Sequence, residues 1–206
     1  MRHYVYKVMY DSGGAPCVHD GALTLAICKP QIRRTARVGD WVYGFGGNRQ
    51  QPANRLIFVG RVDERISDGD YYRLGEFADR PDAIYAWTSD GQLRVKPNAA
   101  FHVDVSDHLR QKDIGRHPGY ENANVLYSEH FRYFGHQAND DWKAGREGLA
   151  RAVVNLGQGH LVRHEGGVQR DLDSLRRMIF RKYSDRVLGH PPLAETGCLS
   201  KCPNRT

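Results

Sequence analysis

The stretch of residues 24–62 constrains the fold of this chain most, because it joins two β-type runs through a glycine-rich turn. The first run reads VGDWVYGFGG and the second, after a polar loop, reads RLIFVGRV. Aromatic residues alternate along the first run, and the second is apolar and β-branched, which is typical of neighbouring strands. The pattern predicts antiparallel strands over residues 38–45 and 56–62, joined by a hairpin loop.

A cluster of basic residues comes directly before the first of these strands. The segment between Asp20 and Asp40 contains no acidic residue and carries Lys29, Arg33, Arg34 and Arg37. Pro30 favours a helical turn over residues 30–36, because its missing N–H costs nothing at a helix start. The free amides at the start of such a turn attract anions. The segment therefore predicts a cationic rim, in which Lys29, Arg33 and Arg34 hold phosphate.

Aromatic side chains flank this cationic rim. Tyr6 lies on an alternating run over residues 3–10 that predicts a strand, and Trp41 and Tyr43 lie on the strand that follows the rim. Binding of a base or nucleotide needs aromatic faces for stacking, cations for phosphate and fixed polar groups for base edges. We therefore predict one shared cavity whose ligand-binding residues are Tyr6, Asp11, Lys29, Arg33, Arg34, Trp41, Tyr43 and Asn48.

The candidates for catalysis are fewer. Cys28 lies beside Lys29 and near Arg33, and such surroundings lower the pKa of a thiol. A thiolate nucleophile would need a general base, for which His19 and His130 are candidates. Asp11 is a further acid–base candidate. The alternative is that Cys28 is a small buried apolar residue, so the sequence leaves open whether the protein is an enzyme.

Two further patterns have spacings close to those of metal sites. His160 and His164 have the spacing that places two imidazoles on one helix face, but glycines surround them and no glutamate stands between them. Cys198 and Cys202 are separated by three residues, whereas a zinc knuckle has two, and no second pair follows. We therefore predict neither a metal site nor a cofactor.

The remaining pattern predicts an α+β fold. Strands are expected over residues 83–88, 93–95, 101–105 and 123–127, helices over 68–79 and 142–155, and a loop over 107–119. The last helix is the clearest, because Asp171 can cap it and apolar residues follow at spacings of three and four. These residues are Leu172, Leu175, Ile179, Tyr183 and Val187. Gly189 and Pro191 are expected to end the helix.

Length and composition bound the class of protein. The 206 residues, 40% hydrophobic and 26% charged, are typical of a globular protein, and we expect a single domain over residues 1–190 with a disordered tail over 191–206. The formal net charge of +6 favours polyanionic partners such as nucleic acid. No segment approaches the roughly 18 apolar residues that span a bilayer, and the first residues lack a secretion signal. A cytoplasmic protein without a membrane partner is expected.

The run TLAICKPQIRRTARVGDWVYGFG resembles the nucleotide modification associated domain families of bacteria and phages. The Tyr-x-Tyr strand before it, with Asp11-x-Gly13 and Ala15-Pro16, belongs to the same resemblance, and residues 125–135 look like the families' C-terminal signature. The resemblance covers most of residues 1–160. The strand pattern is also similar to the PUA-like superfamily, including EVE, ASCH and YTH domains, in which a bent β-barrel holds a modified base in an aromatic pocket.

These resemblances imply a PUA-like mixed β-barrel with peripheral helices and a long C-terminal amphipathic helix. They also imply a nucleic-acid or nucleotide binding module that recognises a modified base, associated with a base-modification or defence system. Two alternatives stay open: an enzyme that modifies a nucleotide or nucleobase, and a protein-interaction subunit of a modification complex. The residues do not distinguish DNA from RNA, nor one base from another.

Overall fold

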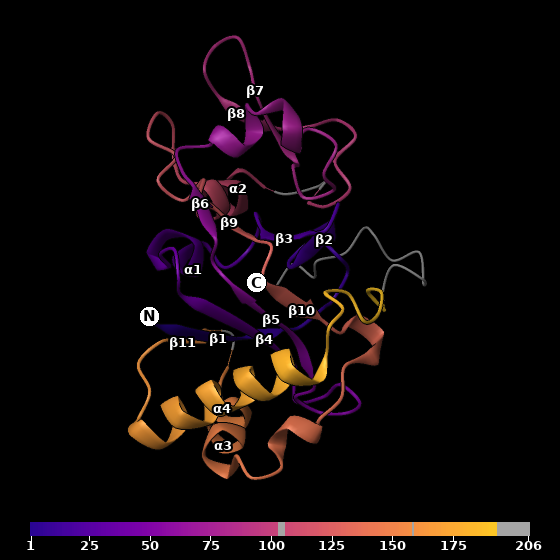
Figure 1. Ribbon diagram of the computed structural model, residues 1–206. Coiled ribbons are helices and arrows are strands. Elements are labelled where there is room, and N and C mark those ends of the chain that lie inside the picture. Colours follow the sequence, from indigo (N-terminus) through magenta and orange to yellow (C-terminus); the bar gives the residue numbers. More distant parts are fainter. Residues whose placement is uncertain (103–105, 158, 193–206) are drawn as a thin grey trace.

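The computed structural model describes residues 1–102, 106–157 and 159–192. Its largest sheet has five strands (Figure 1). Their order across the sheet is β10 (Phe131–Tyr133), β5 (Leu56–Arg61), β4 (Trp41–Gly46), β1 (His3–Val8) and β11 (His160–Leu161). Strand β5 runs antiparallel to β4, as the sequence predicted, and β1 runs parallel to β4 on its other side.

Two smaller sheets complete the β structure of the described residues. The four-stranded sheet has the order β2 (Cys17–His19), β3 (Ala22–Leu25), β9 (Val125–Ser128) and β6 (Glu64–Ile66). The third sheet is a hairpin of β7 (Tyr85–Trp87) and β8 (Leu93–Val95). The described strands therefore form separate sheets and no closed barrel. The predicted mixed α+β fold is confirmed, and the predicted β-barrel is corrected.

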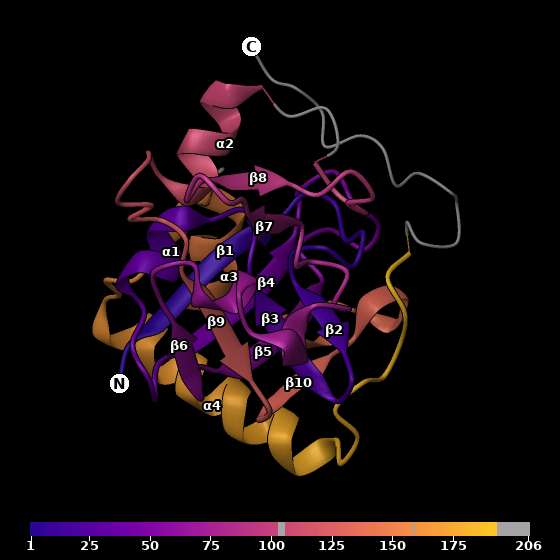
Figure 2. The same ribbon diagram turned by 90° about the horizontal axis from the view of Figure 1, so that it is seen from above.

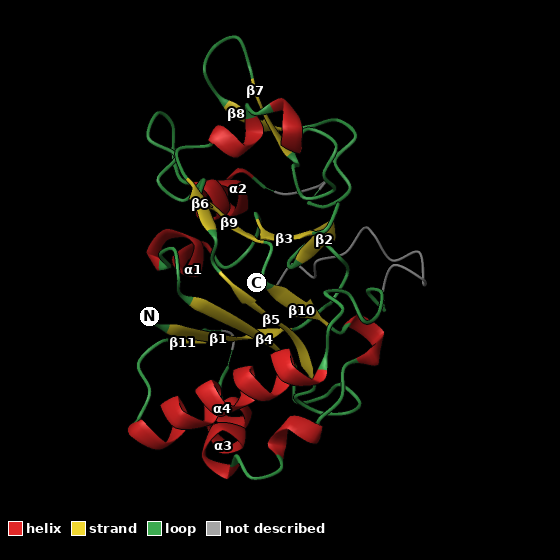
Figure 3. Ribbon diagram, in the orientation of Figure 1, coloured by secondary structure: helices red, strands yellow, loops and turns green. Residues whose placement is uncertain are grey.

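Four α-helices accompany these sheets in the described part of the chain. They are α1 (Pro30–Thr35), α2 (Asp107–Ile114), α3 (Glu147–Asn155) and α4 (Gly166–Lys182). Short 3₁₀ turns are η1 (Asp70–Tyr72), η2 (Gly75–Phe77), η3 (Gly135–Gln137) and η4 (Asp141–Lys143). Helices α3 and α4 cover one face of the five-stranded sheet, while α1 and the four-stranded sheet lie on the other face (Figures 1 and 3). The β7–β8 hairpin and α2 lie beyond the four-stranded sheet (Figure 1), on the side from which Figure 2 is viewed.

The register between β1 and β4 decides which side chains can share a cavity. Trp41 lies opposite His3, and Tyr43 lies opposite Val5, whereas Tyr6 lies opposite Gly44. Paired residues of neighbouring strands point to the same face of a sheet, and successive residues point to opposite faces. Trp41 and Tyr43 therefore share the face that α3 and α4 cover, and Tyr6 points to the other face.

Helix α4 packs its apolar stripe against the five-stranded sheet. Leu172, Leu175 and Ile179 are buried, and they belong to the same core cluster as the strands. The helix starts at Gly166 and ends at Lys182, so Val187 lies beyond it and instead forms a parallel β-bridge with Tyr133. No helix in the described part of the chain is long and apolar enough to cross a membrane.

Several local predictions need correction. Residues 107–114 form α2 rather than a loop, and the side chain of Ser106 caps this helix by accepting a hydrogen bond from the Leu109 amide. Residues 68–79 contain two 3₁₀ turns instead of one helix. Phe101 and His102 are not in a strand. Residues 103–105 and most of the predicted tail, residues 193–206, lie outside the described part.

Candidate active site at the turn between β3 and α1

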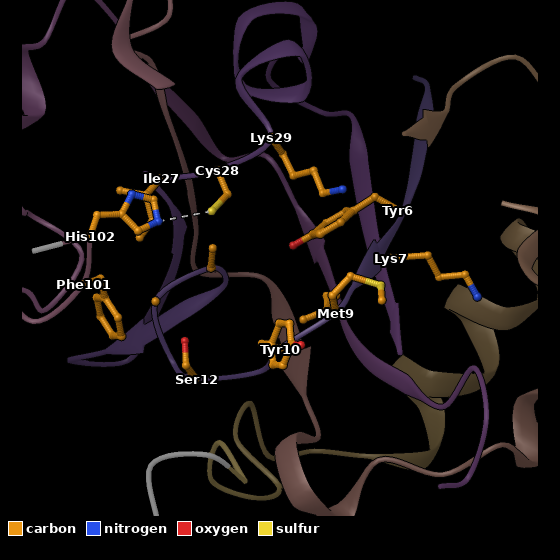
Figure 4. Close-up of a pocket in the computed structure, with 13 residues that line it drawn as sticks. Tyr6, Lys7, Met9, Tyr10, Ser12, Ile27, Cys28, Lys29, Phe101 and His102 are labelled. Atoms are coloured by element: carbon orange, nitrogen blue, oxygen red, sulfur yellow. Dashed lines mark hydrogen bonds between the residues drawn. The ribbon is translucent and has the colours of Figure 1, made fainter. Parts of the chain in front are cut away.

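A cavity of about 340 Å³ opens beside the end of β1 (Figure 4). Three segments line it: β1 and the turn after it, the turn between β3 and α1, and the pair Phe101 and His102. The volume lies at the lower end of the range of about 300–1,000 Å³ in which small-molecule sites fall. The cavity is therefore sized for a small ligand such as a nucleobase or nucleoside.

The turn between β3 and α1 has an unusual backbone. Cys28 has a φ of 60° and Lys29 a φ of 42°, and His102 across the cavity has a φ of 56°. Non-glycine residues rarely adopt this left-handed region, and each such residue costs on the order of 1–3 kcal/mol unless its surroundings impose the conformation. Three neighbouring left-handed residues around one cavity are therefore typical of a functional site.

Arg33 imposes the conformation of this turn. Its side chain is fully buried, and its Nε donates a hydrogen bond of 2.7 Å to the carbonyl oxygen of Cys28. The rest of the guanidinium donates to the carbonyl oxygens of Asn122, Asn124 and Asp113 and to the carboxylate of Asp113, each at 2.7 Å. Asp113 in turn accepts a hydrogen bond from the Cys28 amide at 2.8 Å. All the N–H groups of the Arg33 guanidinium thus donate to oxygen atoms of the protein itself. Arg33 therefore does not lie on the predicted phosphate-binding rim.

A thiol and an imidazole lie close together at the cavity. The Sγ of Cys28 lies 3.7 Å from Nε2 of His102, within hydrogen-bonding range for sulfur (Figure 4). The ammonium group of Lys29 lies 5.1 Å from the centre of the Tyr6 ring, which is a cation–π contact. Burial lowers the pKa of Lys29. The cavity therefore combines a thiol, an imidazole, a half-buried ammonium group and an aromatic ring.

The hydroxyl of Tyr6 is a buried polar group at the cavity that a ligand could pair with. Its side chain is fully buried, and its hydroxyl has no hydrogen-bond partner among the described residues. Burial, with the nearby Cys28 and Asp11 as smaller causes, raises the pKa of Tyr6 well above its usual value, so the phenol stays neutral. In Figure 4 this hydroxyl points towards the side of the cavity that holds Cys28. Buried polar groups are nearly always paired, so this donor fits a ligand in the cavity.

Asp11 lies behind the cavity rather than in its lining. The hydroxyl of Tyr133 donates to its carboxylate, with both oxygens at 2.8 Å. Burial is the main influence on this carboxyl group and raises the pKa of Asp11 from 3.8 to about 6, although the Tyr133 hydrogen bond opposes the shift. Asp11 therefore connects β10 to the loop after β1.

Replacing Asp11 by asparagine is expected to change how stability depends on pH. Because the folded state raises this pKa from 3.8 to about 6, the stabilisation exists below the lower value and is lost as pH rises through the upper one. Above about pH 6.5, Asp11→Asn should gain up to roughly 2–3 kcal/mol relative to the wild type, and below about pH 4 the gain should vanish. Urea unfolding of both proteins at a series of pH values measures this difference in the free energy of unfolding. Asp70→Asn, at an exposed carboxylate, is the control, and a pH-independent difference for Asp11→Asn would contradict the expectation.

The other predicted ligand residues lie away from the cavity. The Trp41 ring packs on Phe180 of α4 at 5.3 Å, and the hydroxyl of Tyr43 donates to the Leu172 carbonyl oxygen at 3.3 Å. Asn48 accepts a hydrogen bond of 2.9 Å from Lys7. Arg34 is exposed on α1 and donates to Gln31 at 2.8 Å. The predicted cavity shared by the arginines and the indole is therefore wrong, because alternation along β4 sends Trp41 and Tyr43 to the helical face.

Of the predicted catalytic residues, some line the cavity and others lie away from it. Cys28 lines the cavity, but His130 does not, because its ring stacks on Phe180 at 4.3 Å on the other side of the sheet. His102 takes the place predicted for a partner of Cys28. The sequence holds no local sign of this role, since His102 is 74 residues away from Cys28 along the chain. Tyr10 and Phe101 also line the cavity and were missed.

The histidine pair at metal-ligand spacing, His160 and His164, is not assembled into a site. His160 lies in β11, and Nε2 of His164 lies 2.7 Å from the carbonyl oxygen of His3, so no helix brings the two imidazoles together. In the described part of the chain, no group of three or more His, Cys, Asp or Glu residues is arranged to hold a metal ion. Cys198 and Cys202 lie outside the described residues.

The model of the family nucleotide modification associated domain 2 matches residues 1–197, which is nearly the whole chain. The chain belongs to this family, which confirms the resemblance to the nucleotide modification associated domain families but not the similarity to the PUA-like superfamily. Neither curated proteins nor solved structures give a significant match.

Proposed function

We propose that the cavity binds a nucleotide, through its base, as part of a system that makes or handles modified nucleobases. Family membership supports the connection with nucleotide modification. The cavity supports a base as the ligand, because Tyr6, Tyr10 and Phe101 offer aromatic surface and Lys29 offers a cation. Recognition of a modified base, in a protein of the cytoplasm, is part of this proposal.

The observation that carries the proposal is the buried, unpartnered hydroxyl of Tyr6 at the cavity. A polar edge of a base would satisfy this donor, and an aromatic side chain beside it would stack on the base. Stacking contributes roughly 1–3 kcal/mol per base. Tyr10 is 50% exposed, so it can cover a base at the mouth of the cavity.

The size of the cavity restricts the form of the ligand. A volume of about 340 Å³ accommodates one base and its sugar but no part of an intact duplex. A base inside a duplex is reached only after it has been turned out of the stack. The ligand is therefore a free nucleotide or an extruded base of a nucleic acid.

Replacing Lys29 by glutamine is expected to weaken nucleotide binding about tenfold or more, since a hydrogen bond to a charged group contributes roughly 1.5–3 kcal/mol. Arg34→Gln is the matched control, because it removes the same charge from an exposed position outside the cavity. Ligands that purify with the wild type are first identified by native mass spectrometry, and nucleoside monophosphates with standard and modified bases are then titrated calorimetrically. Equal losses in both variants, or no binding by the wild type, would overturn the proposal. The second result would favour a protein-interaction subunit.

A further inference from the structure

We infer that Cys28 and His102 form a nucleophile–base pair that adds covalently to a nucleobase held in the cavity. This inference rests on the proposed function for its substrate and goes beyond it by assigning a reaction. Nucleophile and base are recognised by hydrogen-bonding distance between them, which is often longer in ligand-free structures. The separation of 3.7 Å between Sγ and Nε2 meets this condition.

The surroundings of Cys28 favour its thiolate. Lys29, the next residue, brings an ammonium group whose charge interacts with the charge of Cys28. A neighbouring cation and an imidazole that accepts the thiol proton both lower the pKa of a cysteine. The proton would reside on Nε2 of His102, which faces the sulfur.

The backbone of the turn that carries Cys28 is held by hydrogen bonds to buried side chains. Its amide donates to Asp113 and its carbonyl accepts from Arg33, so both polar groups of the Cys28 backbone are fixed by one buried ion pair. The left-handed conformations of Cys28 and Lys29 persist because of these contacts. Arg33 is thus a positioning residue that orients the thiol.

Tyr6 completes the arrangement. Its hydroxyl has no partner in the described structure and remains neutral, so it can donate a hydrogen bond to an atom that becomes negative during the reaction. Preorganised donors aimed at developing charge are among the largest contributions to catalysis. Nucleophile, base and donor come from the β3–α1 turn, the segment of His102 and β1, respectively.

The chemical step is an addition that balances without any further reactant. The thiol proton of Cys28 moves to Nε2 of His102, and the resulting thiolate forms a bond to an electrophilic ring carbon of the base. The π bond of that carbon breaks, its electron pair moves to the conjugated ring nitrogen or carbonyl oxygen, and Tyr6 donates a hydrogen bond there. The imidazolium returns the proton to the substrate, so S–H has added across one π bond. The ring, no longer aromatic, is thereby activated for modification.

Cys17 provides a contrast within the same protein. Its thiol is buried, and burial together with the nearby carboxylate of Asp82 raises the pKa of Cys17 strongly. It does not line the cavity. Cys17 should therefore behave as an unreactive thiol under conditions in which Cys28 reacts.

The test is the rate at which iodoacetamide alkylates Cys28 in the full chain, measured by peptide mass spectrometry between about pH 5.5 and pH 9. The wild-type rate should have its midpoint at about pH 7 or below, compared with about 8.5 for an ordinary thiol. His102→Asn should raise the midpoint by about one unit and slow alkylation near pH 6.5 about tenfold. Asparagine suits this position because it tolerates the left-handed backbone.

Two controls separate this chemistry from loss of folding. His130→Asn removes a histidine outside the cavity and should leave the profile unchanged. Cys17 should stay unmodified in every folded variant. An ordinary midpoint in the wild type, or a midpoint that His102→Asn does not move, would overturn the nucleophile–base pair.

Nucleoside monophosphates added to the same assay distinguish this inference from the proposed function. Nucleotide protection of an activated, His102-dependent Cys28 supports both proposals. Protection of a thiol with an ordinary profile overturns the covalent step and leaves the binding function standing. An activated thiol without protection, in a protein that binds no nucleotide by calorimetry, overturns the proposed function and with it the nucleobase as substrate.

Discussion

Replacing Arg33 by alanine is expected to lower the free energy of unfolding by about 3–5 kcal/mol, which is typical when one partner of a buried ion pair is removed. The guanidinium is fully buried and lies 2.7 Å from the carboxylate of Asp113. Without it, the carbonyl oxygens of Cys28, Asn122 and Asn124 lose the donors that they have in the wild type. Asp113 keeps hydrogen bonds from the Cys28 amide and from the Tyr85 hydroxyl, but its charge loses its cation.

Chemical denaturation followed by circular dichroism measures this loss. Arg34→Ala is the matched control, because it removes the same type of side chain from the next position of the same helix. Arg34 is exposed, and among the described residues its side chain donates a hydrogen bond of 2.8 Å to Gln31 only. We expect that variant to lose less than about 0.5 kcal/mol. Similar losses in both variants would show that the buried hydrogen bonds of Arg33 do not hold the turn.

Arg33 and Arg34 are adjacent in the sequence but have different roles, which the sequence alone did not distinguish. The acid-free segment and Pro30 predicted a helical turn with a cationic rim, and α1 begins at Pro30 as expected. A charge pattern does not reveal which arginine faces inwards, since the answer depends on Asp113, which lies 80 residues away. Both arginines were therefore assigned to phosphate, although one holds the turn and the other lies on the surface.

The strands were predictable because their periodicity is local. Alternation correctly placed Trp41 and Tyr43 on one face of their strand and Tyr6 on one face of another. The pairing of β1 with β4 then decides which faces coincide, and that register is a long-range property. Trp41 and Tyr6 consequently lie on opposite faces of one sheet, although each strand was located correctly.

The cavity was only partly predictable for the same reason. Tyr6, Cys28 and Lys29 were predicted because an aromatic ring, a thiol and an ammonium group each indicate a possible binding or catalytic role from the residue type alone. His102 was missed because it lies in an irregular segment, and α2, which follows that segment, was predicted as a loop because its sequence is mostly polar. Only the fold brings this histidine to Cys28.

Replacing Gly135 by alanine is expected to cost about 3 kcal/mol or more, and to release the segment of residues 186–190 from the sheet. Gly135 has a φ of 52°, and a Cβ there would overlap the backbone carbonyl group of His190, with its carbon only 2.7 Å away. The left-handed conformation alone costs an alanine roughly 1–2 kcal/mol. Relief of the overlap requires the backbone of this segment to move, because the three nearest atoms belong to the backbone of Gly189 and His190.

The segment of residues 186–190 is held by backbone hydrogen bonds to β10 and η3. The Tyr133 amide donates to Arg186, the Leu188 amide donates to Tyr133, and the His136 amide donates to His190, each at 2.8 Å. Hydrogen exchange at the amides of Leu188 and His136 should therefore accelerate in Gly135→Ala. Gly145→Ala is the matched control, because Gly145 has a φ of 69° and no atom of the described residues lies within 4 Å of its Cβ position. It isolates the conformational cost, so equal losses of stability in the two variants would contradict the predicted overlap.

Release of this segment should also reach the cavity. Pro191 follows it directly and packs against Gly13, since a Cβ at Gly13 would lie 3.1 Å from the Pro191 ring. The loop that contains Gly13 supplies Ser12 and Gly14 to the cavity lining. Gly135→Ala should therefore weaken nucleotide binding as well as stability, whereas Gly145→Ala should leave binding unchanged. Calorimetric titration of both variants, at a temperature where each is fully folded, tests this; unaltered affinity in Gly135→Ala would show that the loop keeps its place without the C-terminal segment.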